Sequence, residues 1–178
     1  MISLIKDTLP NFPDEVIRDW LLQYAKAYGW PPELDVDGVP SNGWKLLLDS
    51  RPLSFFQMLD WKKECKHIPI NEIAIKSQEA LCMIFDSVIS KRQNILNSKR
   101  RFENIVSNIK SNGLIPKVPA LLFDNNKYFI LDGNHRLAAY YYCYGYFQVE
   151  LDSDLMLMTK EKQHYWIAYT EKRTCCST

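Results

Sequence analysis

The segment KYFILDGNHRLAAYYYCYGY, residues 127–146, constrains the fold of this chain more than any other. An apolar run ends at Asp132-Gly133, polar residues follow at once, and a second apolar run begins at Leu137. An apolar run that stops at a turn pair and is followed by a longer apolar run is typical of a strand that leads into a helix. The segment therefore predicts a strand that turns at Gly133 into a helix reaching about Tyr144.

The polar residues of this turn have the properties of an anion site. The first N–H groups of a helix lack partners within the helix and lie at the positive end of its dipole. Gly133 can adopt positive φ and allows close approach to the backbone, and Asn134 is expected to cap the helix. Arg136 offers a planar fork for phosphate oxygens, and His135 can donate to an anion or exchange a proton near neutral pH. Gly133, Asn134, His135 and Arg136 are therefore the predicted phosphate-binding residues. The alternative is an ordinary turn whose polar side chains face solvent.

Length, composition and charge favour a single globular domain. A chain of 178 residues is long enough to bury a core without disulfides or metals. The net charge of +1 excludes an overall field that attracts nucleic acid or membrane, so any such binding needs a local patch. The cysteines form no CxxC pair, and no apolar run approaches the ~18–20 residues that span a bilayer. We therefore expect a cytoplasmic protein with free thiols and no transmembrane segment.

The remaining periodicities predict a mixed α/β unit preceded by helices. Apolar residues at three- and four-residue steps predict a helix from Pro13 to Tyr28, and residues 44–61 are expected to be helical in part. The elements expected next are a strand at 68–70, a helix capped by Ser77, a helix ending at Asn112-Gly113, a hairpin over 118–131, the helix after Gly133 and a strand over 147–151. Residues 155–169 fit a helix or a strand. The expected domains are a helical N-terminal extension over 1–65, an α/β domain over 66–152 and a C-terminal segment over 153–178, together forming one compact domain.

The stretch from Arg101 to Leu151 resembles the ParB/sulfiredoxin superfamily, the fold of the ParB-like N-terminal domain. The resemblance is carried by IKSNGL at 109–114, PKVP at 116–119, the hairpin, and DGNHRLAA at 132–139, and IPI at 68–70 fits the family's opening strand. It covers about half of the chain. It implies a small mixed sheet with helices and a turn that binds nucleotide phosphates.

Departures from the family pattern separate this chain from two of its branches. Sulfiredoxin-like members carry a reactive Cys where this chain has Asn134, and Cys143 lies too far along the helix to replace it. Partition proteins have Glu-Arg-Arg after the Gly and a downstream helix-turn-helix domain, for which residues 152–178 are too few. The Asp-Gly-X-His-Arg form is closest to members that bind ATP or ADP, including the free-serine kinases, which usually have His in place of Asn134.

The resemblance implies ATP or ADP with Mg²⁺ as the ligand, ahead of CTP, and hydrolysis or phosphoryl transfer as the candidate activity. Catalysis would use His135, and Asp132 would hold Mg²⁺ or orient His135. Glu72 lies in the region where kinase-like members keep an acidic catalytic residue; the alternative is a solvated Glu at the end of a strand. Without a general base, the protein would bind nucleotide without turnover.

Two other classes of function remain open. The first is a non-catalytic interaction or inhibitor protein with the same fold, such as a plasmid- or phage-borne accessory factor. The second is a DNA-acting nuclease, which the basic run from Lys91 to Arg101 favours. Lys99, Arg100 and Arg101 are the candidate nucleic-acid contacts and would make binding steeply salt-dependent, unless they form a solvated helix face. The C-terminal CCST, residues 175–178, fits the C-a-a-X pattern of prenylation but has no aliphatic residues in the middle.

Overall fold

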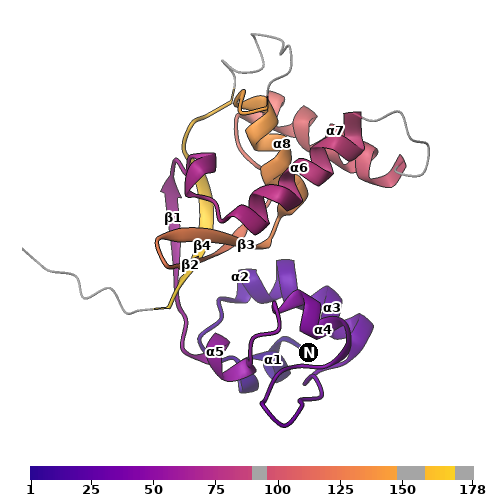
Figure 1. Cartoon of the computed structure of the whole chain (residues 1–178), viewed down its shortest axis with the longest axis vertical. Coiled ribbons are helices and arrows are strands. Elements are labelled where there is room, and N and C mark those ends of the chain that lie inside the picture. Colours follow the sequence, from indigo (N-terminus) through magenta and orange to yellow (C-terminus); the bar gives the residue numbers. More distant parts are fainter. Residues whose placement is uncertain (90–95, 148–158, 171–178) are drawn as a thin grey trace, which may run out of the picture. The chain divides into compact units, whose positions relative to one another are not determined.

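The structure is a computed structural model that describes residues 1–89, 96–147 and 159–170 (Figure 1). It is a mixed α/β protein with helices at its N-terminal end and a four-stranded sheet in the order β1-β4-β2-β3. Contacts divide the chain into two compact units, Met1–Lys62 with Trp166–Thr178, and Lys63–Tyr165. This division differs from the predicted domains, because β4 (Gln163–Tyr169) lies beyond residue 152 and contributes residues to both units. Among the described residues, no helix combines the length and the apolarity needed to cross a bilayer.

The first unit is built from short helices. They are α1 (Ile2–Thr8), α2 (Asp14–Val16), α3 (Leu22–Tyr28), α4 (Asn42–Leu47) and α5 (Leu53–Gln57), and a π-helical turn over Ile17–Leu21 joins α2 to α3. The helix predicted over residues 13–28 is therefore confirmed, whereas α1 was not predicted. The apolar stripe of that helix forms a core, in which the buried ring of Phe12 packs against those of Trp20 and Phe56.

The first strand lies earlier than the sequence predicts. β1 covers Asp60–Lys66, and the segment after it forms a 3-10 helix, η2 (Ile70–Glu72). The strand expected at 68–70 is wrong, and Pro69 gives a physical reason, because it has no N–H to donate to a strand ladder. Within the described residues, this segment contacts the sheet through an isolated bridge between Ile73 and Tyr128.

The predicted hairpin is confirmed, and it contains an irregularity beside the turn of interest. β2 (Ala120–Asp124) pairs antiparallel with β3 (Lys127–Asp132), and the loop residues Asn125 and Asn126 have φ of +50° and +59°. Positive φ at both positions is the type I′ geometry that two-residue hairpin loops favour. Ala120 pairs with Asp132 but Leu121 pairs with Ile130, so Leu131 is an extra residue in β3. The extra residue lies two positions before Gly133 and has the pattern of a β-bulge, a feature that typically bends a strand.

The longest helices that the structure describes belong to the second unit, where Figure 1 labels them α6, α7 and α8. They are α6 (Ile75–Ile89), α7 (Leu96–Asn112) and α8 (Asn134–Cys143), and α8 packs against both α6 and α7. Ser77 does not cap α6, because the helix begins two residues earlier. Its hydroxyl oxygen instead accepts a hydrogen bond from the N–H of Ile130 at 3.1 Å, which satisfies one donor of β3. Residues 148–151 of the strand expected after Phe147 lie outside the described residues, and β4 shows that the ambiguous segment ends as a strand.

Candidate functional site

The turn after β3 opens a helix, as the sequence predicts, but its capping residue differs. Gly133 is the N-cap of α8 and has a φ of +103°, whereas Asn134 is the first helical residue and makes no side-chain cap. A Cβ atom at position 133 would lie 3.0 Å from Cβ of Pro119 and 3.2 Å from Nε of Arg136. The expected Asn134 cap is therefore wrong, because the helix begins at Asn134 itself and the cap position before it has a positive φ, which favours glycine. The turn is tight and brings Arg136 back over Gly133.

Arg136 lies mostly buried and forms an ion pair one helical turn back. Its Nη2 donates to Oδ2 of Asp132, and the two side chains are 13% and 19% exposed, respectively. Its Nη1 is buried and has no hydrogen-bond acceptor among the described residues. From the sequence we expected the whole guanidinium group of Arg136 to face a ligand. In the structure its Nη2 is instead bonded to Asp132. A buried donor without an acceptor costs free energy, so an anionic oxygen at Nη1 would be stabilised there.

His135 is held in its neutral form. Burial disfavours the imidazolium, and the positive charge of Arg101 repels it, so the pKa of His135 is lowered from its ordinary value. A neutral imidazole at pH 7 can accept a proton, which a general base requires. α7, which carries Arg101, packs against α8.

A groove of about 550 Å³ runs beside α7. It is lined by Arg100, Arg101, Asn104, Ile105, Asn108 and Pro116. Arg100, Asn104 and Asn108 are exposed and recur every four residues, which places them in one row on the helix surface. Among these lining residues there is no carboxylate, and most carry N–H donors. The groove is therefore suited to a ligand that is anionic and rich in acceptors.

The side of α7 opposite the groove carries an ion pair and borders an apolar cavity. Lys99 lies 3.9 Å from the carboxylate of Glu103, and neither residue lines the groove. Glu103 instead borders an apolar cavity of about 480 Å³, with Phe85, Val88, Phe102, Val106, Ser107, Lys110 and Tyr142. The predicted nucleic-acid contacts are thus divided between two faces, because Arg100 and Arg101 line the groove and Lys99 does not.

Glu72 is not joined to the turn by any described hydrogen bond or ion pair. It ends η2 and is exposed. Its charge contributes to the raised pKa of Tyr141, although burial of the phenol is the main cause. Tyr141 lies about 10 Å along α8 from Asn134, at 1.5 Å per residue. The structure therefore brings Asp132, His135 and Arg136 together and gives no described link from them to Glu72.

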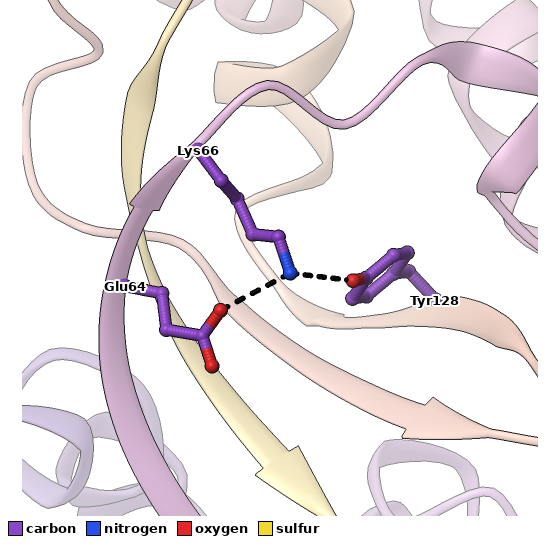
Figure 2. Close-up of polar contacts among 3 residues, drawn as sticks. All are labelled: Glu64, Lys66 and Tyr128. Atoms are coloured by element: carbon purple, nitrogen blue, oxygen red, sulfur yellow. Dashed lines mark hydrogen bonds and ion pairs between the residues drawn. The ribbon is translucent and has the colours of Figure 1, made fainter. Parts of the chain in front are cut away.

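A second polar cluster lies on the sheet, formed by Glu64, Lys66 and Tyr128 (Figure 2). Nζ of Lys66 donates to the hydroxyl of Tyr128 at 2.8 Å and lies 3.1 Å from a carboxylate oxygen of Glu64. Burial lowers the pKa of Lys66, but the hydrogen bonds to Tyr128 and Glu64 outweigh it, and the pKa is raised overall. Lys66 therefore stays protonated, so this cluster lacks the neutral amine that a lysine nucleophile or base requires.

The thiols and carboxylates limit two kinds of chemistry. Burial raises the pKa of Cys143 to about 12, so this thiol is not a reactive nucleophile. Among the described residues, no group of three or more His, Cys, Asp or Glu side chains could hold a metal ion. Mg²⁺ at Asp132 would therefore take its other ligands from water and nucleotide phosphates, which is how Mg²⁺ is commonly bound.

The sequence analysis did not identify the amide residues of the groove. Asn104 and Asn108 follow Arg100 at four-residue steps, and this spacing was the available signal. Pro116 could not be assigned to the groove without knowing how the loop after α7 folds. Comparisons of the chain with models of protein families, with curated proteins and with solved structures found no match.

Proposed function

We propose that the protein binds a nucleotide, ATP or ADP in preference to CTP, at the first turn of α8 and along the groove of α7. One observation carries this proposal. α7, whose residues Arg100 and Arg101 line the groove, packs against α8, and in this proposal the donors of both helices serve one ligand. The resemblance to the ParB/sulfiredoxin superfamily supports the proposal, and it is the basis for preferring adenine nucleotides.

Each group at the turn has a distinct part in holding phosphate. The first N–H groups of α8 and its dipole favour negative charge beside Gly133. Arg101 contributes a guanidinium from the groove, and Nη1 of Arg136 is a buried donor that lacks an acceptor among the described residues. Asp132 would bind Mg²⁺, which when present neutralises phosphate charge. Because the carboxylate already pairs with Arg136, Mg²⁺ at this position would compete with that ion pair.

Turnover is an extension of this proposal. His135 is neutral near pH 7 because its pKa is lowered, so it can accept a proton from water or from an acceptor hydroxyl. Glu72 was the other candidate for this role and has no described link to the turn. Phosphoryl transfer or hydrolysis would therefore depend on His135 rather than on Glu72. The core of the proposal is nucleotide binding, which does not depend on whether turnover follows.

Calorimetric titration with ATP, ADP and CTP, each with and without Mg²⁺, tests the proposal. We expect ATP or ADP to bind more tightly than CTP. Arg101→Ala should weaken binding about tenfold or more, because a charge-assisted hydrogen bond contributes about 1.5–3 kcal/mol. Lys99→Ala is the matched control, since it removes the same charge from the other face of α7, and it should change the affinity less than about twofold.

Two results would contradict the proposal. If no nucleotide binds to the folded wild-type protein, the non-catalytic interaction protein becomes the better interpretation. If Arg101→Ala and Lys99→Ala weaken nucleotide binding equally, the affinity depends on the total charge of the protein and not on contacts in the groove.

A further inference from the structure

We propose that the groove of α7 also binds the phosphodiester backbone of a nucleic-acid strand, without reading its base sequence. This inference rests on the proposed phosphate site at the first turn of α8 and extends its ligand from a single nucleotide to a polymer. The chemical class of the ligand is a chain of phosphodiesters, and the surface that would recognise it is the row Arg100, Asn104 and Asn108 together with Arg101.

The length of the row favours a polymer. From Arg100 to Asn108 the helix rises roughly 12 Å, at 1.5 Å per residue. This is about the axial length of three to four nucleotides along one strand of a duplex, at 3.4 Å each. α7 packs against α8, the helix that carries the proposed phosphate turn. A strand that follows the row would place successive phosphates along α7.

The chemistry of the lining favours the backbone over the bases. Arg and Asn side chains are common donors to phosphate oxygens, and such contacts position a nucleic acid without reading its sequence. The lining residues include no aromatic ring on which a base could stack, and no carboxylate that could accept from a ribose hydroxyl or a base amine. Ile105 and Pro116 supply the apolar part of the groove. Repeated phosphates match this lining better than a base does.

The far end of the row is held in place by a neighbouring amide. Nδ2 of Asn112 donates to Oδ1 of Asn108 at 3.3 Å and to the carbonyl oxygen of Asn108 at 3.2 Å. Because Oδ1 of Asn108 already accepts this bond, the amide hydrogens of Asn108 are the groups that it can offer to a ligand. Those hydrogens require an acceptor, and a phosphate oxygen is one.

The binding should be weak and moderately salt-dependent. Arg100 and Arg101 are the cationic residues that line the groove, and two neutralised phosphates give a slope of log Kobs against log salt of about −1.4 for a single strand. The net charge of +1 adds no attraction at long range. A strongly basic surface would instead give a much steeper slope.

Fluorescence anisotropy with a labelled 20-nucleotide single strand, at salt concentrations from 50 to 200 mM, tests this inference; a duplex of the same length and free ADP are measured in parallel. We expect Arg100→Ala to weaken strand binding about threefold or more at 50 mM salt and to reduce the salt slope by about 0.7. Asn108→Asp should also weaken strand binding, because it places a carboxylate in the row. Lys99→Ala is the control for Arg100→Ala, and Asn126→Asp, in the exposed hairpin loop outside the groove, is the control for Asn108→Asp; we expect each control to change strand binding less than twofold.

The outcomes separate this inference from the proposed function. If ADP binds but neither strand nor duplex does, the groove serves a free nucleotide and the inference is overturned, while the proposed function stands. If strands bind but no nucleotide does, the proposed function is overturned, while the inference that the groove binds phosphodiesters stands. Equal losses for Arg100→Ala and Lys99→Ala would overturn the inference, because binding would follow total charge. Single strand and duplex are compared by their affinities. The one that binds more tightly, and whose binding is weakened by Arg100→Ala, is the source of the phosphodiesters.

Discussion

Arg136 combines a structural contact with a proposed ligand contact, and the two can be separated by mutation. Arg136→Ala removes an ion pair between two mostly buried side chains, so the free energy of unfolding should fall by about 1–3 kcal/mol. Nucleotide affinity without Mg²⁺ should fall about tenfold or more. Arg136→Lys should not restore that affinity, because an ammonium cannot reproduce the planar fork. Chemical denaturation and calorimetric titration measure the two effects.

The double variant Asp132→Ala/Arg136→Ala is the decisive control for Arg136. Removing both partners leaves neither charge unpaired, so it should recover much of the stability that Arg136→Ala loses. It should not recover nucleotide affinity, because the donors of Arg136 are still missing. Recovery of both properties to wild-type values would show that Arg136 only stabilises the turn.

His135 gives the molecule a pH dependence of defined sign. Its pKa in the folded protein is lowered by burial and by Arg101, so the unfolded state binds more protons as the pH falls below the ordinary histidine value of about 6.5. The free energy of unfolding should therefore decrease with falling pH in that range. The melting temperature of the wild-type protein should fall more steeply between pH 7.5 and 5 than that of His135→Asn.

If His135→Asn and the wild type show parallel melting curves over this pH range, then the pKa of His135 is not lowered and its role as a neutral base has no support.

At the residue scale, the sequence predicted the position of the turn but not the state of its side chains. Asp132-Gly133 between two apolar runs is a local signal, and a positive φ at Gly133 follows from local sterics. Arg136 and Asp132 are four residues apart, so their pairing is local, but the burial of both side chains depends on how the rest of the chain packs around the turn. Burial of the Arg136 fork could not be read from the sequence for that reason.

At the scale of elements, α7 shows that the residues of the basic run do not share one surface. Its sequence alternates charged and apolar residues with a helical period, so the helix itself was predictable. Its neighbours decide which charges share a surface. One face carries the groove with Arg100 and Arg101, and the other carries the Lys99–Glu103 pair beside the apolar cavity. The division of a basic run between two faces requires knowing how α7 packs against α8.

The strands also differ in how well the sequence predicts them. The β2–β3 hairpin was predictable because its signal is local, namely two short apolar runs on either side of an Asn-Asn turn. β1 was missed because DWKKECK has few apolar residues, and it becomes a strand through pairing with distant parts of the chain. Lysines on a strand at the edge of a sheet also discourage pairing with other chains. Strands made by long-range pairing are the elements that a local pattern describes least well.

At the scale of the whole molecule, the candidate site belongs entirely to the unit Lys63–Tyr165. The groove, the α8 turn, Asp132 and Glu72 all lie in that unit. The other unit has its own core and its own side-chain contacts, such as the donation from Nε1 of Trp166 to Oε2 of Glu15 at 2.8 Å. The nucleotide proposal therefore assigns no ligand contact to the first 62 residues.

Mapping of amide chemical shifts by NMR, with ¹⁵N-labelled protein titrated with ADP and Mg²⁺, tests the central claim most directly. That claim is that phosphate is held where the first turn of α8 meets the groove of α7. The backbone amides of Asn134, His135 and Arg136 and the side-chain amides of Asn104 should show the largest saturable shifts, while the amide of Lys66 should not move. Saturable shifts centred on another surface, or no shift at millimolar ADP in a folded protein, would contradict the account.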